Sequence, residues 1–239
     1  MVQGGPPSGE ARPERFEPDA LIELPLELAL SKLPPGRHGL SRSFVVRNQR
    51  LRMVAAMLRV LPRHGYTGTT IGHLTQEAGV SRAAFYGQFA SKEECFLATY
   101  DLAGRWLCER VERAVNVNDE WPDRVRTGIS EALRLFAANT PLAQLIAVEA
   151  AQAGPAARER QQACLAHFAE ALRAGRPRRK DLPADLEELL LGGVLSLIAR
   201  YVDTGRTEQL PDVTAELVRY LLIPYLKPDE LARVAARAA

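Results

Sequence analysis

The stretch HGYTGTTIGHLTQEAGVSRAAFYGQFASKEECF, residues 64–96, decides the fold of this chain. Thr70 is placed to cap a helix over residues 71–78, because its hydroxyl can accept a hydrogen bond from the first free amides of that helix. Gly79 can take the positive φ that a tight turn requires. Ser81 is placed to cap a second short helix, RAAFYGQF. The stretch therefore predicts two short helices joined by a glycine turn.

A longer helix is predicted on each side of this pair. The helix before it has apolar residues at the i, i+3, i+4, i+7 spacing of one buried face: Leu51, Val54, Ala55, Leu58 and Leu61. Pro62 and Gly65 are expected to end that helix. After the pair, Ser91 and Glu94 form an S-x-x-E capping box that opens a long helix. The second short helix is expected to bury two aromatic residues four positions apart, Phe85 and Phe89.

The charge of the chain is concentrated around this stretch. The formal net charge is only +2, but residues 37–92 hold nine Lys/Arg against Glu77 alone, a local charge of +8. Residues 1–36 and 93–239 each carry a charge of −3. An ordinary solvated surface mixes both signs, so a compact basic block indicates a module that binds a polyanion such as nucleic acid.

Residues 64–96 resemble the DNA-binding signature of the TetR family of bacterial transcription regulators. The matching elements are Gly65-Tyr66, Thr69-Thr70-Ile71, Ala78-Gly79-Val80-Ser81, Phe85-Tyr86, Phe89 and Ser91-Lys92-Glu93. The resemblance implies that the second short helix enters the major groove of double-stranded operator DNA. It also implies a homodimer and a small-molecule effector.

The resemblance carries DNA contacts onto individual positions. The side chains expected to contact phosphates are Thr70, Tyr86 and Lys92. Ser81 opens the recognition helix, and the side chains along it that are expected to contact bases are Arg82, Ala83, Ala84 and Gln88. Arg82 suits guanine, Gln88 suits adenine, and the alanine methyls suit thymine methyls. The alternatives are that Thr70 is only a helix cap and Lys92 only a solvated charge.

Two positions of the recognition segment complicate this assignment, and an upstream basic segment leaves two interpretations open. Gln88 occupies a position that is often histidine in the family, so an operator sequence cannot be transferred from relatives. Gly87 should weaken the recognition helix by about 1 kcal/mol relative to alanine. Upstream, basic residues could reach the minor groove or belong to a merely flexible linker: Arg37, His38 and Arg42.

The rest of the chain predicts an all-α fold. Proline and glycine punctuation places helices over residues 122–139, 141–152, 155–174, 184–204, 211–226 and 228–238. We expect a partly disordered N-terminal extension (1–36), a three-helix helix-turn-helix DNA-binding domain (37–92), and a larger helical effector-binding and dimerisation domain (93–239).

Two features of the larger domain suggest its roles. The segment LEELLLGGVLSLIARYVDTG, residues 186–205, is apolar almost all round, so it must be buried on more than one side, which favours a helix of the implied dimer interface. Residues 213–226 are expected to form its partner helix, which Pro224 would shorten. The alternative is an internal core helix of a monomer. Three residues are candidates for ligand contact, namely Glu149, His167 and Trp121. Their alternatives are a salt bridge, a satisfied core histidine and plain packing, respectively.

Other function classes find little support in the sequence. No nucleophile elbow, phosphate loop or zinc-protease motif is present, so we expect no enzyme activity and no cofactor. The three widely spaced cysteines indicate no zinc site and fit a reducing cytoplasm, and we expect no membrane anchor. The favoured function is a repressor that binds a near-palindromic operator as a dimer and is released by a small molecule. The alternatives are an activator of the same fold and a dimeric helical ligand-binding or interaction protein without operator specificity.

Overall fold

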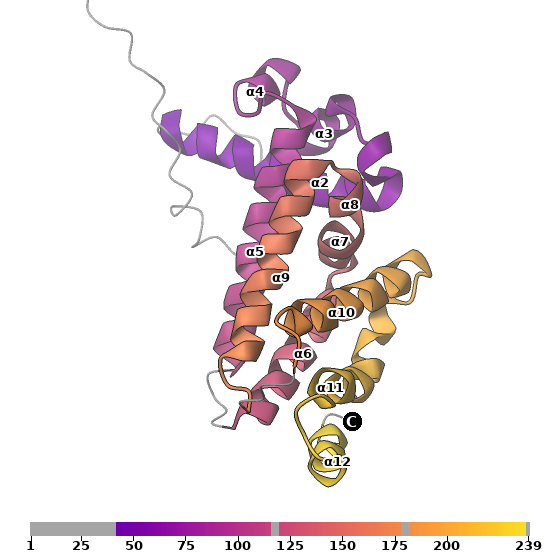
Figure 1. The fold of residues 1–239 in the computed structure, drawn as a ribbon. Coiled ribbons are helices and arrows are strands. Elements are labelled where there is room, and N and C mark those ends of the chain that lie inside the picture. Colours follow the sequence, from indigo (N-terminus) through magenta and orange to yellow (C-terminus); the bar gives the residue numbers. More distant parts are fainter. Residues whose placement is uncertain (1–41, 116–119, 178–181, 238–239) are drawn as a thin grey trace, which may run out of the picture.

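The computed structural model describes residues 42–115, 120–177 and 182–237, with side chains from Val46 onward. Throughout these ranges the regular elements are helices, which confirms the predicted all-α class (Figure 1). The predicted N-terminal extension and the basic residues Arg37 and His38 lie outside the described residues, as does the side chain of Arg42. No helix in the described ranges is long and apolar enough to cross a membrane.

The N-terminal helices form a small head. It comprises α2 (Arg42–Gly68), α3 (Ile71–Ala78) and α4 (Arg82–Tyr86). The apolar face predicted along α2, from Leu51 to Leu61, is buried. The prediction that Pro62 ends α2 is wrong: the helix runs past it and breaks at Gly65, whose φ is 61° and ψ 174°. A proline removes one backbone donor but leaves the following residues free to stay helical, whereas the positive φ of a glycine does not.

Helix α4 is shorter than the sequence predicts. It ends at Tyr86, and Gly87 is its C-cap, so the helix does not extend over RAAFYGQF. Phe85 and Phe89 are nevertheless both buried, with ring centroids 5.7 Å apart. The aromatic pair therefore anchors the segment in the core of the head although only Phe85 belongs to the helix.

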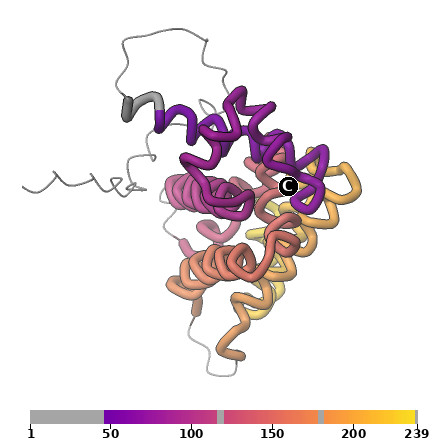
Figure 2. The backbone as a smooth tube through the Cα atoms, turned by 90° about the horizontal axis from the view of Figure 1, so that it is seen from above, coloured from indigo at the N-terminus to yellow at the C-terminus, as the bar shows by residue number. Residues whose placement is uncertain are grey.

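A long helix joins the head to the rest of the molecule. Helix α5 (Lys92–Val115) starts beside the head and runs down the body next to α9 (Figures 1 and 2). The further elements of the body are α6 (Trp121–Ala138), α7 (Thr140–Gln144), a π-helical turn η2 (Leu145–Glu149), α8 (Ala150–Gln152), α9 (Pro155–Arg173), α10 (Leu186–Asp203), a 3-10 turn η3 (Thr207–Val213), α11 (Thr214–Leu222) and α12 (Pro228–Ala236). One continuous hydrophobic core runs through head and body.

Helix α11 follows one detail of the sequence prediction. It ends at Leu222, two residues before Pro224, as expected from the proline. The start of the helix predicted over residues 211–226 instead belongs to the separate turn η3. Gly193 of α10 lies against the Tyr220 hydroxyl, where a Cβ atom would clash, while Gly192 faces open space. The absence of a side chain at Gly193 thus allows Tyr220 to approach α10 closely, whereas Gly192 has no such neighbour.

A buried ionic cluster fastens the end of α9 to α10 and α11. The Glu187 carboxylate is fully buried and lies 3.3 Å from Arg173 Nε and 3.0 Å from Arg176 Nε. The Tyr225 hydroxyl donates to it at 2.7 Å. Burial alone would raise the pKa of Glu187, but the hydrogen bond from Tyr225 and the two guanidinium charges outweigh it and hold that pKa below its usual value.

Candidate functional site

The outer surface of the head presents α4 through a set of local caps. The Thr70 hydroxyl accepts from the His73 amide at 3.1 Å, and the Ser81 hydroxyl accepts from the Ala84 amide at 3.0 Å. Gly79, between the two helices, has a φ of 63°. The predicted helix starts and the glycine turn are therefore confirmed, and they fix the direction in which α4 projects.

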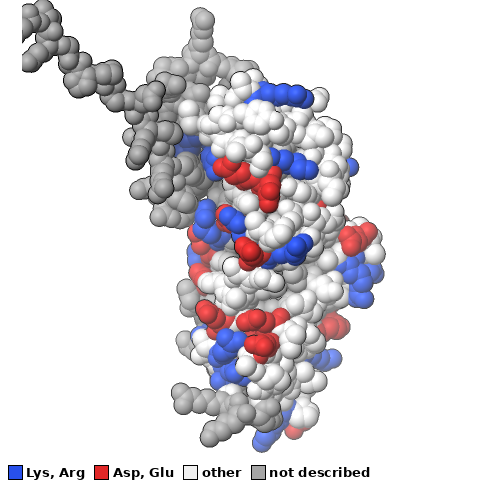
Figure 3. Space-filling model, turned by 45° about the horizontal axis from the view of Figure 1, so that its top comes forward, with Lys and Arg blue, Asp and Glu red and all other residues white. Residues whose placement is uncertain are grey.

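Most of α4 faces solvent. Arg82 and Ala83 are exposed, Ala84 is half-buried, and Tyr86 is 57% exposed. Among the described residues, the Arg82 guanidinium has no hydrogen-bond or ion-pair partner, which leaves its donors available. Figure 3 turns this end of the molecule forward and shows Lys and Arg side chains projecting from it.

Gln88 is placed differently from its sequence prediction. It lies in the turn after α4 instead of along the recognition helix, because Gly87 ends that helix. The Gln88 carbonyl accepts from Arg50 Nη1 at 2.8 Å, and the Arg50 guanidinium lies 4.2 Å from the centre of the Phe89 ring. Arg50 of α2 therefore holds the turn in place. Gln88, which is half-buried, follows directly after the exposed end of α4.

Lys92 is engaged inside the protein. Its ammonium donates to the Tyr66 carbonyl at 2.7 Å and lies 4.2 Å from the centre of the Tyr66 ring. Burial lowers the pKa of Lys92 from its ordinary value. An ammonium has three donors, so one is used at Tyr66 and two remain for an anion.

Part of the basic charge of the head is also used internally. Arg59 and Arg63 pair with Glu77 at 2.7 Å and 3.4 Å, and Arg52 donates to the Gly79 carbonyl at 3.1 Å. The hydrogen bond from Arg59 is the main reason that the pKa of Glu77 lies below its usual value. These bonds brace α3 and its turn against α2, and Arg82 is left as the free cation of α4 within the described part of the head.

Glu149 joins the body to the head and is not a cavity residue. Its buried carboxylate accepts from the Tyr66 amide and from Gln144 Nε2, both at 2.7 Å. Gln144 Nε2 also lies 3.3 Å from the Leu61 carbonyl. The break at Gly65 disrupts the helical hydrogen bonding around Tyr66. The Glu149 carboxylate supplies an acceptor for the Tyr66 amide, which the break leaves without a helical partner. The Glu149 carboxylate is thus engaged at this junction, and its role as a ligand residue stays a prediction.

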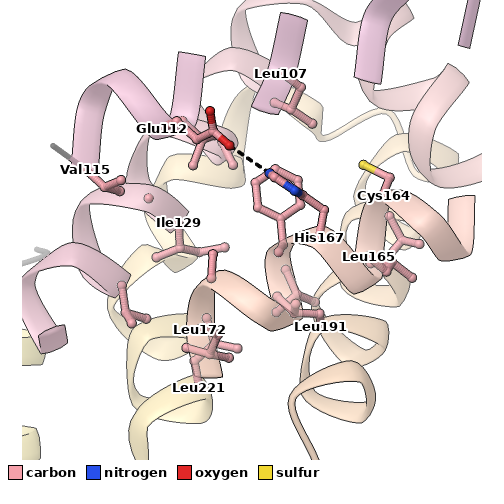
Figure 4. A pocket seen from close by; sticks show the side chains of 18 of the residues that line it. Leu107, Glu112, Val115, Ile129, Cys164, Leu165, His167, Leu172, Leu191 and Leu221 are labelled. Atoms are coloured by element: carbon pink, nitrogen blue, oxygen red, sulfur yellow. Dashed lines mark hydrogen bonds and ion pairs between the residues drawn. The ribbon is translucent and has the colours of Figure 1, made fainter. Parts of the chain in front are cut away.

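The body encloses a cavity of about 340 Å³. Its walls come from α5, α6, α9, α10 and α11 and are mostly aliphatic and aromatic, including Leu107, Val111, Ile129, Phe168, Leu191 and Leu221 (Figure 4). At its rim, His167 Nε2 lies 2.9 Å from Glu112 Oε1, and both side chains are about half exposed. Such an arrangement suits an apolar ligand with a polar end near the rim.

The other two predicted ligand residues do line this cavity. His167 pairs with Glu112 at the surface, so it is not a satisfied core histidine. Trp121 Nε1 donates to the Leu172 carbonyl at 2.9 Å, which satisfies its polar atom and leaves its ring for the cavity wall. Sequence reasoning missed Glu112 and Arg124, since only packing of separate helices brings them to the cavity and no local pattern marks them.

Comparisons with known proteins agree with this geometry. Residues 54–99 match the family model described as bacterial regulatory proteins, tetR family. The HTH-type transcriptional regulator CymR of Pseudomonas putida is 26% identical over 178 residues, which cover 70% of this chain and 88% of the relative. The fatty acid degradation regulator FadR from Bacillus halodurans shares the fold with a TM-score of 0.65 at 17% identity, over 73% of this chain and 94% of that one.

A second solved structure is the transcriptional regulator FadR from Bacillus subtilis in complex with stearoyl-CoA. Its TM-score is 0.61 at 18% identity, over 72% of this chain and 96% of that one. The all-helical body, the capped helix-turn-helix head and the matched residues agree: residues 54–99 match the DNA-binding domain of the TetR family, and the chain resembles regulators of that family in sequence and fold.

Proposed function

We propose that this protein is a dimeric repressor that binds near-palindromic operator DNA through α4 and releases it when an apolar small molecule fills the cavity of the body. The observation that carries this proposal is the outward α4: caps at the starts of α3 and α4 hold it, and its Arg82 guanidinium has no partner among the described residues. The head that presents it is hydrogen-bonded to the cavity-bearing body through Tyr66.

Side-chain chemistry separates the residues proposed to contact bases from those proposed to contact phosphates. Arg82 can donate two hydrogen bonds to guanine, and the Ala83 and Ala84 methyl groups can contact thymine. Gln88 contributes from the turn after α4. The remaining positions, Thr70, Ser81, Tyr86 and Lys92, supply hydroxyl and ammonium donors to phosphates, which set orientation without reading sequence.

The dimer is proposed to form through the outer faces of α10 and α11. Leu189 is 67% exposed, Ile223 63% and Tyr220 40%, although all three are large hydrophobic residues. Apolar side chains gathered on one face of a soluble protein mark an interaction surface. A two-fold pairing there would present two α4 helices to successive major grooves, about 34 to 36 Å apart.

Ligand binding and DNA binding can be coupled through two elements that touch both sites. Helix α5 carries Leu107 in the cavity wall and Lys92 at Tyr66. The turn η2 carries Ile146 in the cavity wall and Glu149 at Tyr66. A ligand that shifts either element changes the support of the Gly65 break, and so the direction of α4. The dimer would exist in two states, one with the α4 separation that fits DNA and one without it. The ligand releases DNA because it binds the second state more tightly than the first.

DNA binding and assembly are tested first. The full-length protein is incubated with fragmented DNA from its source genome, bound fragments are sequenced, and the mass of the free protein is measured by light scattering. We expect enrichment of a near-palindromic motif and a mass of two chains. Sequence-independent binding would favour a ligand-binding or interaction protein of the same fold, and a monomer at all concentrations would overturn the proposed mode of operator binding.

The ligand site is tested with stearoyl-CoA and with stearate as probes. Ala132→Phe places a large side chain in the cavity, and Ala138→Phe, at the exposed end of the same helix α6, is the matched control. Calorimetry should show binding of a probe to the native chain and the control but not to Ala132→Phe. Equal binding by all three proteins would place the ligand elsewhere, and no binding of either probe would reject a long acyl chain as the ligand.

Coupling is tested with Glu149→Gln, which keeps the size of the side chain but removes its charge. We expect the folded protein to bind operator more weakly and to respond less to the ligand, because the Tyr66 amide loses a charge-assisted hydrogen bond. Glu159→Gln, on the exposed surface of α9, is the control. An unchanged ligand response in Glu149→Gln would show that the signal does not pass through Tyr66.

A further inference from the structure

Two cysteines meet between α5 and α9. Cys108 of α5 and Cys164 of α9 lie close enough for each thiol to shift the pKa of the other. Both residues are partly exposed and line a second cavity of about 330 Å³, and Cys164 also lines the apolar cavity described above. Two thiols that line one cavity on packed helices can be oxidised to a disulfide if their sulfurs close to the bond length of about 2.0 Å.

The second cavity contains donors that have no partner within the described structure. The Tyr100 hydroxyl lacks a hydrogen bond although the residue is only 2% exposed, and so does Arg105 Nε. Both groups line the cavity beside the thiols, and space is open above Gly104. A buried polar group without a partner is costly and indicates a missing ligand or water.

The polar side chains around the thiols do not assemble a metal site. Glu112 follows Cys108 by one turn and His167 follows Cys164 by one turn, but these two side chains pair with each other at 2.9 Å. In the described ranges no group of three or more His, Cys, Asp or Glu side chains is placed to hold a metal ion. The arrangement therefore favours chemistry of the thiols themselves.

We propose that Cys108 and Cys164 are a peroxide-reactive pair: a hydroperoxide enters the cavity, accepts hydrogen bonds from the Tyr100 hydroxyl and Arg105 Nε, and converts the two thiols into a disulfide between α5 and α9. This modification site goes beyond the regulator function proposed above. It would let the protein respond to an oxidant as well as to an apolar ligand.

The chemistry balances with the hydroperoxide as the oxidant. Cys164 loses its proton, its sulfur attacks the terminal oxygen, and the O–O bond breaks to give a sulfenic acid and an alkoxide that takes up that proton. The Cys108 thiol then attacks the sulfenic sulfur, forms the S–S bond and releases water. Two thiols are oxidised by two electrons, and the hydroperoxide is reduced to an alcohol and water. The neighbouring Cys108 thiol lowers the pKa of Cys164, which agrees with Cys164 as the attacking sulfur.

The disulfide would act on elements already linked to the head. It ties α9 to α5 one residue from Leu107, which lines the apolar cavity, and α5 begins at Lys92 on the Tyr66 carbonyl. Oxidation would therefore change the cavity wall and the support of the head in one step.

The test is a mass measurement that requires neither DNA nor the apolar ligand. The full chain is treated with hydrogen peroxide or cumene hydroperoxide, remaining thiols are alkylated after denaturation, and peptides are mapped without reduction. We expect a linked peptide pair containing Cys108 and Cys164, while Cys95 stays alkylatable. Cys95 is an internal control, because burial raises its pKa to about 12. Because this readout is independent of operator binding, it can fail or succeed separately from the proposed regulator function.

Three variants make the assignment sharper. Cys108→Ser should leave a sulfenic acid on Cys164 that a dimedone probe traps, and Cys164→Ser should leave Cys108 unreactive on the same time scale. Tyr100→Phe keeps both thiols and the core volume, and should slow disulfide formation about tenfold if its hydroxyl binds the peroxide. Trp106→Phe, on the same helix and outside the second cavity, should react at the native rate.

Several outcomes would overturn the proposal. They are disulfides between different chains, oxidation of Cys95 at the same rate, or a Cys108–Cys164 reaction no faster than that of free cysteine. A native rate in Tyr100→Phe would remove the binding role assigned to that hydroxyl. If Cys108→Ser or Cys164→Ser does not fold, the native chain still decides the matter through the identity of its linked peptides.

Discussion

The head and the body of this protein are both built from helices, but the head presents a surface and the body encloses a cavity. The head packs its aromatic residues tightly inward and leaves Arg82 and Tyr86 outside, on a helix held by caps only three residues away. The body keeps a cavity of about 340 Å³ open between helices that are distant in sequence and braces it with a buried ionic cluster. A rigid reading surface can therefore be specified locally, whereas a ligand cavity requires long-range support.

The largest difference between the regions should come from the head core. Phe85→Ala should lower the free energy of unfolding by about 3–5 kcal/mol, because Phe85 is fully buried and its removal leaves a void. Phe168→Ala, in the half-buried wall of the body cavity, should cost less, since that side chain already borders empty space. Urea unfolding of both variants measures the difference between their losses in the free energy of unfolding. Equal losses would mean that the body is packed as tightly as the head.

The next effect concerns the ionic cluster of the body. Glu187→Gln should destabilise the protein by about 3 kcal/mol, because it leaves Arg173 and Arg176 without their buried counter-charge. The exposed neighbour Glu188→Gln should change stability by less than about 0.5 kcal/mol. Chemical unfolding at neutral pH compares them.

The same pair tests a dependence on pH. The pKa of Glu187 is lower in the folded state than its ordinary value of 4.5, so its contribution is present above that pH and is lost as the pH falls through the folded pKa. The gap between native chain and Glu187→Gln should therefore shrink below about pH 4.5. A gap that stays constant down to pH 3 would contradict an ionised Glu187.

A smaller effect separates two kinds of DNA contact in the head. Arg82→Ala should weaken operator binding by about 1–3 kcal/mol and relax sequence preference, because its guanidinium is free to meet bases. Lys92→Ala should weaken binding to all sequences alike and reduce the salt dependence. Titrations of specific and random duplexes at several salt concentrations measure both, with Arg200→Ala on α10 as control. The same loss of specificity in both variants would refute the division.

The smallest effect tests how locally α4 is built. Ser81→Ala should cost about 1 kcal/mol of stability, because the Ala84 amide loses its capping acceptor. Gln162→Ala, at an exposed position of α9, should stay within about 0.5 kcal/mol. Thermal unfolding checks both, and a neutral Ser81→Ala would show that α4 is held mainly by its buried Phe85.

Sequence reasoning succeeded where the physical cause is local. The caps at Thr70, Ser81 and Ser91, the positive φ at Gly79 and the buried face of α2 all follow from contacts within a few residues. It failed at the end of α4, where the glycine already recognised as a weakness stops the helix. It could not foresee the junction at Glu149, because the hydrogen-bond partner Tyr66 lies 83 residues away.

The amino-acid sequence by itself determined the all-α class, the capped helix starts, the basic block and the family that the head resembles. Only the tertiary structure decided that Glu149 and Lys92 meet at Tyr66, that His167 and Glu112 form the rim of an apolar cavity, and that Cys108 and Cys164 line one cavity. The physical reason is range: caps and helical periodicity act over three or four residues, whereas a cavity, a domain junction or a thiol pair exists only once separate helices have packed.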